Sequence, residues 1–146
     1  MQDRFGTFSL LINRISRNIY RIKNKEIAAF NLKSTHVSCL YHLYKNDGLT
    51  ATDLCQRCEE DKAAVSRSLD YLEKNEYVIC KSEQPKRYKS PFYLTAKGRE
   101  VGKEIIDKID KILDAVGSGL TEEERALFYR YLSSISNSLE NIANNL

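Results

Sequence analysis

The sequence lacks the features that identify membrane-spanning, secreted and catalytic proteins. None of its apolar stretches approaches the ~18 consecutive residues that a membrane-spanning helix needs. Its first residues show no basic start followed by an apolar run and a small-residue cleavage site, so we expect a cytoplasmic protein without a secretory signal. It has no set of nucleophile, base and acid, and no glycine-rich loop that would hold a phosphate. We therefore expect no enzyme activity and no cofactor.

Proline is scarce and the overall charge is low. The chain of 146 residues has two prolines, Pro85 and Pro91, which border one short segment, so the rest is predicted to be mainly helical. Its 42% hydrophobic and 29% charged residues are an ordinary soluble globular balance. A net charge of +3 excludes a polycation, yet basic residues concentrate in residues 1–25 and 81–90. These segments suit either a phosphate-contacting surface or an ordinary solvated surface.

Four cysteines could form pairs, but the chain is too long and too rich in core residues to need a disulfide framework. They are Cys39, Cys55, Cys58 and Cys80. Cys55 and Cys58 fall on one short predicted helix and no second pair follows, which favours packing thiols over a zinc site. His36 and Cys39 share a helix face, but His42 turns away from it. We predict reduced thiols and no metal, with thiol oxidation or metal sensing as alternatives.

Hydrophobic periodicity predicts a mainly helical chain interrupted by one hairpin. Residues 77–81 and 91–94 are rich in β-branched and aromatic side chains, which predicts two strands joined by a basic loop. Elsewhere apolar residues recur at helical spacing. The predicted helices cover residues 7–29, 34 or 35 to 46 with Ser34 or Thr35 as the N-cap, a short segment after Thr50, 62–75 after Asp61, 96–116, and a last helix after the capping box at 121–124.

This order of elements is typical of a winged helix-turn-helix. Two short helices are joined by the acidic turn 59–61, and a basic hairpin follows them. The predicted fold class is therefore mainly α with a small β-hairpin wing (α+β). We expect one domain over residues 1–146, with the winged helix-turn-helix at about 34–95 and dimerisation helices at about 7–29 and 96–146.

The helix 62–75 has the composition of a recognition helix for double-stranded DNA. The N-terminal residues of such a helix reach base edges in the major groove. Ala63 and Ala64 leave a thin edge that can approach bases, and Arg67 can reach guanine or phosphate, although it could instead pair with Asp70 on the protein surface. The candidate DNA-binding residues are Thr50, Thr52, Lys62, Ala63, Ala64, Ser66, Arg67, Lys86, Arg87 and Lys89.

The remaining helices have more apolar surface than a small winged helix can cover. Apolar residues form stripes at 8–22, 101–112 and 128–142. Such stripes predict a homodimer built from the terminal helices, in which two recognition helices meet successive major grooves. The alternative is an intramolecular bundle of the three long helices.

Four segments together resemble the MarR (multiple-antibiotic-resistance regulator) family. They are residues 49–54 (LTATDL), 61–74 (DKAAVSRSLDYLEK), 93–98 (YLTAKG) and 120–124 (LTEEE), in the order and spacing of the family. The resemblance implies a homodimer with intertwined end helices that binds a pseudo-palindromic site and regulates transcription. It also implies DNA release by a phenolic ligand, metal or oxidant, in a crevice near Tyr20, His36 and Tyr44.

The chain departs from the family pattern at two places. The family usually has glycine at position 76, where this chain has Glu76, and we expect Asn75 to supply the left-handed turn instead. The family's wing usually carries an Asp two residues before an Arg, whereas Lys86 and Tyr88 occupy those positions here. Arg87 is then the nearest candidate for the wing-tip arginine.

The function predicted from the sequence is a DNA-binding transcriptional regulator, specifically a ligand- or stress-responsive repressor. Its predicted partners are double-stranded DNA, a second copy of the chain and a small-molecule inducer, and no membrane. The alternative is a winged-helix dimer that binds protein rather than DNA. The basic residues of both the recognition helix and the wing favour DNA, because a protein-binding module would not need them.

Overall fold

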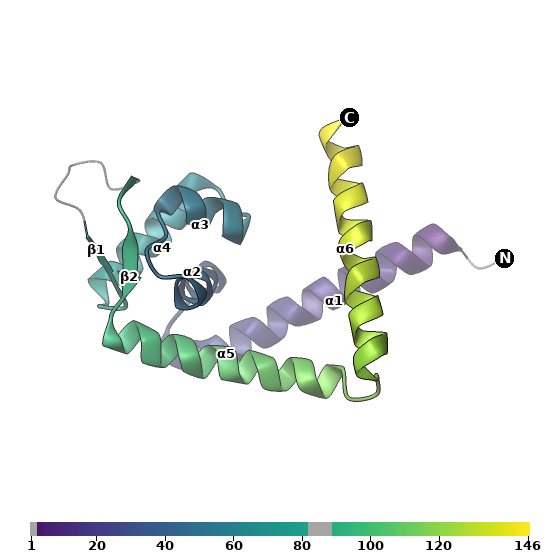
Figure 1. Ribbon diagram of the computed structural model, residues 1–146, viewed down its shortest axis with the longest axis horizontal. Helices are drawn as coiled ribbons and strands as arrows, with labels where there is room; N and C mark the ends of the chain where they lie inside the picture. Colours follow the sequence, from purple (N-terminus) through teal and green to yellow (C-terminus); the bar gives the residue numbers. More distant parts are fainter. Residues whose placement is uncertain (1–2, 82–88) are drawn as a thin grey trace. The chain divides into compact units, whose positions relative to one another are not determined.

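The computed structural model describes residues 3–81 and 89–146, and these residues are mainly helical with one hairpin (Figure 1). The predicted fold class, mainly α with a β-hairpin, is confirmed. The elements are α1 (Arg4–Ile27), η1 (Ala28–Phe30), α2 (Ser34–Lys45), α3 (Ala51–Cys58), α4 (Lys62–Lys74), β1 (Val78–Cys80), β2 (Phe92–Leu94), α5 (Ala96–Val116) and α6 (Glu122–Asn144).

The chain divides into two compact units, residues 1–108 and 109–146. The first unit holds the apolar core, to which α2, α3, α4 and the hairpin contribute. Its most buried side chains are Ile27, Val37, Leu40, Leu43, Leu54, Val65, Leu69, Leu72 and Val78. The second unit contains the end of α5 and all of α6, whose residues are exposed or half-buried. No helix among the described residues is long and apolar enough to cross a membrane.

Side-chain caps begin three of the helices at the predicted residues. The Thr50 hydroxyl accepts a hydrogen bond from the Asp53 amide at 3.1 Å, and the Asp53 carboxylate accepts one from the Thr50 amide at 3.0 Å. The Asp61 carboxylate accepts from the Ala64 amide at 2.7 Å and so begins α4. Thr121 and Glu124 form the same reciprocal pair at the start of α6. These caps satisfy amide groups that have no partner within the helix.

Two other helices begin earlier than the spacing predicts. α1 begins at Arg4 because the Asp3 carboxylate accepts from the Gly6 amide at 3.0 Å. The N-cap of α2 is Lys33, not Ser34 or Thr35. Nδ1 of His36, in the first turn of α2, accepts a hydrogen bond from the Lys33 amide at 2.9 Å, so the capping side chain lies inside the helix and not at its N-cap. Histidine is an uncommon capping partner, and preference for Ser or Thr at N-caps misplaced this end.

The left-handed residue that ends α4 is Glu76, and the expectation for Asn75 was wrong. Glu76 has φ +64°, whereas Asn75 has φ −93°. The Asn75 side chain instead donates to the Tyr71 carbonyl at 2.8 Å, within the last turn of the helix. The Tyr77 amide then bonds the Leu72 carbonyl at 2.8 Å, which closes the turn and starts the hairpin. The chain tolerates a non-glycine residue in this conformation at a cost of about 1 kcal/mol.

The hairpin is a short antiparallel pair with a third segment beside it. Val78 faces Leu94 and Cys80 faces Phe92 in the register of β1 and β2. Leu49, in the segment between α2 and α3, forms an isolated bridge with Phe92, and the Phe92 amide donates to the Leu49 carbonyl at 2.9 Å. The hairpin is therefore anchored to the helix-turn-helix through backbone hydrogen bonds.

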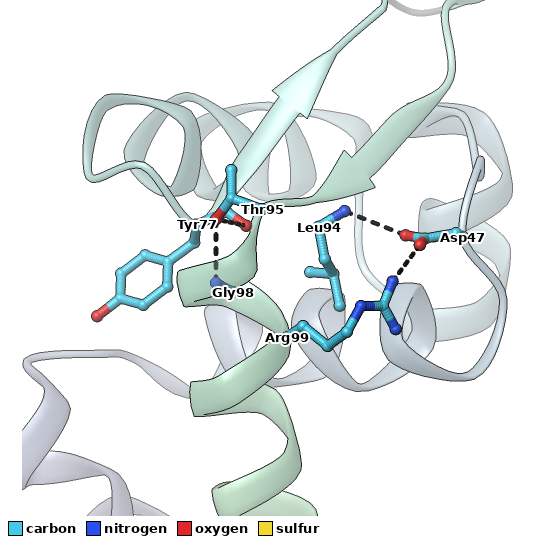
Figure 2. Close-up of polar contacts among 6 residues, drawn as sticks. All are labelled: Asp47, Tyr77, Leu94, Thr95, Gly98 and Arg99. Atoms are coloured by element: carbon cyan, nitrogen blue, oxygen red, sulfur yellow. Dashed lines mark hydrogen bonds and ion pairs between the residues drawn. The ribbon is translucent and has the colours of Figure 1, made fainter.

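Helix α5 begins in close contact with the turn before β1 (Figure 2). The Thr95 hydroxyl accepts a hydrogen bond from the Gly98 amide at 3.0 Å, and it lies within donating distance of the Glu76 carbonyl at 2.6 Å and the Tyr77 carbonyl at 3.2 Å. A β-carbon at Gly98 would lie 2.0 Å from the Tyr77 carbonyl oxygen, far inside van der Waals contact. Only glycine permits this approach, because the Tyr77 backbone and the Leu94 side chain leave no room for a β-carbon.

We expect Gly98→Ala to destabilise the protein by about 1–3 kcal/mol, because the backbone of α5 must shift away from Tyr77. Gly102→Ala is the matched control on the same helix. A β-carbon there would lie 3.6 Å from the Tyr44 ring, an ordinary contact. Alanine has the higher helix propensity, so this variant should gain about 0.5–1 kcal/mol. Urea unfolding of both variants measures the difference, and equal stabilities would contradict the close approach.

Candidate nucleic-acid interface

The packing of α2, α3 and α4 determines which side of α4 faces solvent. Val65, Ser68, Leu69 and Leu72 are buried on one side of α4. The turn between α3 and α4 is tight, since Glu59 has φ +52° and the Glu60 amide bonds back to the Cys55 carbonyl at 3.3 Å. The opposite side of α4 therefore lies on the surface.

The predicted recognition residues lie on this exposed side. Lys62, Ala63, Ser66 and Arg67 are exposed, and Ala64 is half-buried. They occupy the first two turns of α4, the end at which the helix dipole is positive and favours an anion. This end of α4 can therefore approach a negatively charged surface closely. It presents the cations Lys62 and Arg67 beside the small side chains of Ala63 and Ala64.

The two threonines near α3 have different surroundings. Thr50 is half-buried, and its hydroxyl caps α3 through the Asp53 amide. Thr52, in the first turn of α3, is exposed. The exposed hydroxyl of Thr52 is therefore better placed to contact a DNA phosphate. The hydroxyl of Thr50 is already used in the cap of α3.

The predicted wing cations are only partly within the described residues. Lys89 is exposed in the segment that precedes β2. Lys86 and Arg87 lie outside the described residues. The ends of the wing are nevertheless held by β1 and β2, so its point of attachment beside α4 is defined by the hairpin register.

Asp47 ties the turn after α2 to the hairpin and to α5 (Figure 2). Its carboxylate accepts from the Leu94 amide at 3.1 Å and pairs with the Arg99 guanidinium. The Arg99 and Asp47 side chains are 51% and 33% exposed, so the ion pair adds ~0–1 kcal/mol. The hydrogen bond to the Leu94 amide contributes more to stability than the ion pair, because a buried strand amide without a partner costs about 1–3 kcal/mol. Sequence patterns showed no signal for this contact, which joins residues 47 apart.

The three candidate effector residues lie in unlike surroundings. His36 is buried, and its ring stacks on Tyr71 with 4.2 Å between ring centroids. Tyr44 is half-buried near Gly102 of α5, with the Arg99 guanidinium 5.9 Å from its ring centre. Tyr20 lies on α1 with 59% of its surface exposed. His36 thus has a capping and packing role, while Tyr20 and Tyr44 keep accessible surface.

Cys39 lies near Cys55 and Cys58 in the folded chain. The spacing of the cysteines in the sequence did not indicate this. All four cysteines are free thiols, and Cys39 is fully buried in α2. The neighbouring Cys58 thiol at the end of α3, and then burial, raise the pKa of Cys39. Within residues 3–81 and 89–146, no group of three or more His, Cys, Asp or Glu side chains could hold a metal ion.

Two helices keep large exposed apolar stripes. The apolar residues of α1 that form the predicted stripe are 38–59% exposed: Phe8, Leu11, Ile12, Ile15, Ile19 and Ile22. Those of α6 are 37–60% exposed: Phe128, Leu132, Ile135, Leu139 and Ile142. The stripe at 101–112 differs, because Ile105 is only 4% exposed and packs within its own unit. Stripes of this size on α1 and α6 are unusual for a monomer.

Comparison with known proteins gives one family and one fold. Residues 30–87 match the model of the MarR family. The solved Staphylococcus aureus MepR–DNA complex has 23% identity and a TM-score of 0.79, covering 90% of this chain and 97% of that chain. A MarR-family transcriptional regulator from Silicibacter pomeroyi has 28% identity and a TM-score of 0.77, covering 94% and 90%. S. aureus MarR in complex with salicylate and kanamycin has 16% identity and a TM-score of 0.83, covering 93% and 92%. No curated protein matches the chain.

The cap of α2 makes the stability of the protein depend on pH. Burial, and then the charge of Lys33, lower the pKa of His36 below its usual value. Burial and the charge of Arg57 lower the pKa of His42 as well. A protonated His36 cannot accept the Lys33 amide at Nδ1, so protonation removes the cap. The unfolded chain then binds more protons than the folded one, and stability must fall as pH drops below about 6.5.

We expect His36→Gln to flatten this dependence. Unfolding free energies measured by urea titration between pH 7.5 and 5.5 should decline with falling pH in the wild type and less steeply in His36→Gln. His42→Gln is the control for the second histidine. It should remove only the contribution of His42 to the pH dependence of the unfolding free energy. The assignment fails if His36→Gln shows the same decline as the wild type.

Proposed function

We propose that the chain is a ligand- or stress-responsive repressor that binds specific DNA sequences. The support is the match of residues 30–87 to the MarR family model and the likeness of the fold to solved regulators of that family. The observation that carries this proposal is the exposed first half of α4. There Lys62, Ser66 and Arg67 stand beside the small Ala63, while the other side of the helix is buried.

This face meets the requirements of the major groove. The groove admits one helix, whose first residues contact base edges. Ala63 lets α4 approach closely, and its methyl can touch a thymine methyl. Arg67 can donate two parallel hydrogen bonds to guanine. An arginine that served only solubility would not need this position on α4.

The other candidate residues would contact the DNA backbone. Thr52 and Lys89 are exposed on either side of α4 in the sequence, and Lys86 and Arg87 belong to the same basic wing segment. Phosphate contacts position a protein without reading sequence, and each one releases counterions. The S. aureus MepR–DNA complex, a structure of the same fold, supports this use of the fold.

Arg67→Ala should weaken binding to the preferred site by about 1–3 kcal/mol and relax sequence preference, because a base contact is lost. Lys89→Ala should weaken binding evenly across sequences and lower the salt slope by about one. Fluorescence anisotropy with labelled duplexes at several salt concentrations measures both effects.

Lys103→Ala is the control for these variants. Lys103 is an exposed cation on α5 that pairs with Asp107 at 3.3 Å, so its removal changes net charge equally without touching α4 or the wing. Its affinity and salt slope should match the wild type. If Arg67→Ala and Lys103→Ala bind the preferred site equally well, α4 is not the reading helix. Binding by any variant that ignores salt would favour the protein-binding alternative.

We further propose that the chain acts as a homodimer through its terminal helices. The support is the exposed apolar stripes of α1 and α6, which a second copy would cover. A twofold dimer presents the same surface twice, which suits a pseudo-palindromic site with half-sites one helical turn apart.

A charge within the α6 stripe tests the dimer. Leu139 is 51% exposed in the single chain, so Leu139→Asp should leave the fold intact, yet it should dissociate a dimer that buries the stripe. Asn137→Asp adds the same charge on the opposite side of α6 and should not change the mass. Light scattering gives the mass of each. A dimeric Leu139→Asp protein, or a monomeric wild type, would rule out assembly through this stripe.

An inducer acting between helices would complete the proposed regulation. α1 and the first half of α5 lie close together, since the Lys108 ammonium is 3.9 Å from the Glu26 carboxylate and 5.4 Å from the Phe30 ring centre. A ligand beside Tyr20 or Tyr44, the two candidate residues that keep accessible surface, would alter how α5 holds the winged helix. It would weaken DNA binding only as far as it prefers the DNA-incompetent form.

A titration of the protein–DNA complex with aromatic acids, including the salicylate bound by S. aureus MarR, tests this step. We expect loss of DNA affinity at unchanged dimer mass, and a shift of that response in Tyr44→Phe. Loss of affinity caused by dissociation of the dimer, or no response to a broad panel, would contradict an inducer of this kind.

A further inference from the structure

Tyr71 joins helix α4 to the segment between α1 and α2. Its hydroxyl donates a hydrogen bond of 2.6 Å to the Asn31 carbonyl, which lies 40 residues away in the sequence. Its ring stacks on that of His36 in the first turn of α2, with 4.2 Å between the ring centroids and 3° between the ring planes. A single side chain of α4 therefore contacts both the chain just before α2 and the beginning of α2 itself.

Asn31 lies in a segment that its neighbours hold in place. Asn31 has the left-handed conformation, with φ +55°, which asparagine adopts more readily than most residues. Leu32, directly after it, is only 6% exposed. Phe30, directly before it, has the Lys108 ammonium of α5 5.4 Å from its ring centre. The carbonyl that Tyr71 reaches therefore belongs to the place at which α1 ends beside α5.

The flank of α4 that carries Tyr71 also carries two candidate DNA-binding residues. Arg67 precedes Tyr71 by four residues and Ala64 precedes it by seven, so the three lie one above another along the helix. Arg67 is exposed, whereas Ala64 and Tyr71 are half-buried at the border of the buried side. A contact made by Tyr71 therefore restrains the flank from which Arg67 projects.

The apolar core determines which side of α4 faces inward, but it does not determine the exact angle of the helix. Val65, Leu69 and Leu72 are buried, and apolar burial has no preferred direction. A hydrogen bond and a stacked ring pair do have a preferred geometry. An arginine that donates two parallel hydrogen bonds to a base must be held to within about 0.5 Å of its place. The contacts of Tyr71 supply a directional restraint that the core lacks.

We propose that Tyr71 is a positioning residue for DNA reading, which holds α4 at the angle at which Arg67 meets a base. This inference rests on the proposed function. The hydrogen bond to Asn31 selects one orientation of α4 among those that the core permits. The shift in that equilibrium can be no larger than the contribution of the bond itself. Loss of one such bond leaves nearly all molecules folded, so lower stability alone would not change DNA affinity.

Tyr71→Phe in the full-length protein tests the hydrogen bond, because it removes the hydroxyl and keeps the stacked ring. Its affinity for the preferred duplex, measured by fluorescence anisotropy, should fall about two- to tenfold, the range that one hydrogen bond supplies. Tyr41→Phe is the matched control, since it removes a hydroxyl from an exposed tyrosine of α2, and it should bind like the wild type. Unchanged affinity in Tyr71→Phe, or an equal loss in both variants, would overturn the proposal.

A double-mutant cycle tests whether Tyr71 acts through Arg67. The position of residue 67 no longer matters once its guanidinium is absent, so Tyr71→Phe should lose most of its effect in the Arg67→Ala background. Lys89→Ala is the comparison background, because Lys89 lies outside α4, and there the full effect should remain. Effects that multiply independently in both backgrounds would show that Tyr71 does not position Arg67, and would overturn the proposal.

Amide hydrogen exchange of the protein without DNA separates this inference from the proposed function. Tyr71→Phe should speed exchange in residues 28–36 and 62–74, the two segments that its hydroxyl joins, and Tyr41→Phe should not. A wild type that binds no DNA, although exchange in Tyr71→Phe is faster, contradicts the proposed function alone. A wild type that reads DNA, although exchange in Tyr71→Phe is unchanged, contradicts the role of Tyr71 alone.

Discussion

The burial of one side of α4 against α2 and α3 is the constraint on which the rest of the structure depends. Val65, Leu69 and Leu72 fill the core, and this contact decides that Lys62 and Arg67 face solvent. Rotation of α4 by one residue, about 100°, would expose Val65 and bury a cation. The penalty for either change is several times the stability offered by any surface contact, so the outward face is fixed by the inward one.

The start of a helix could be predicted from the sequence where the capping side chain directly precedes that helix. Thr50 and Asp61 each precede a helix whose first amides they satisfy, and the spacing of apolar residues then determines the buried side. The same reasoning misplaced the start of α2, because the capping group is the imidazole of His36 rather than a hydroxyl. It also assigned the left-handed turn to Asn75 instead of Glu76, since residue preference is weaker than the hydrogen bonds that close this turn.

Contacts between residues far apart in the chain had no signal in the sequence. Asp47 meets the Leu94 amide and Arg99 only because the hairpin folds back beside α2 (Figure 2). The candidate DNA-binding side chains of α4 could be chosen from sequence, because a helix presents its first residues in a fixed pattern. The positions of Lys86 and Arg87 lie outside the described residues.

Selection of bound duplexes from a random DNA pool tests the central claim most directly, since it asks at once whether the protein binds DNA and whether it reads sequence. The account predicts enrichment of an inverted repeat with half-sites about one helical turn apart, and binding that weakens steeply as salt is raised. It also predicts that Arg67→Ala loses preference at a symmetric pair of positions within that repeat. No enrichment over many rounds, or enrichment of a motif that Arg67→Ala selects equally well, would contradict the assignment of α4 as a recognition helix.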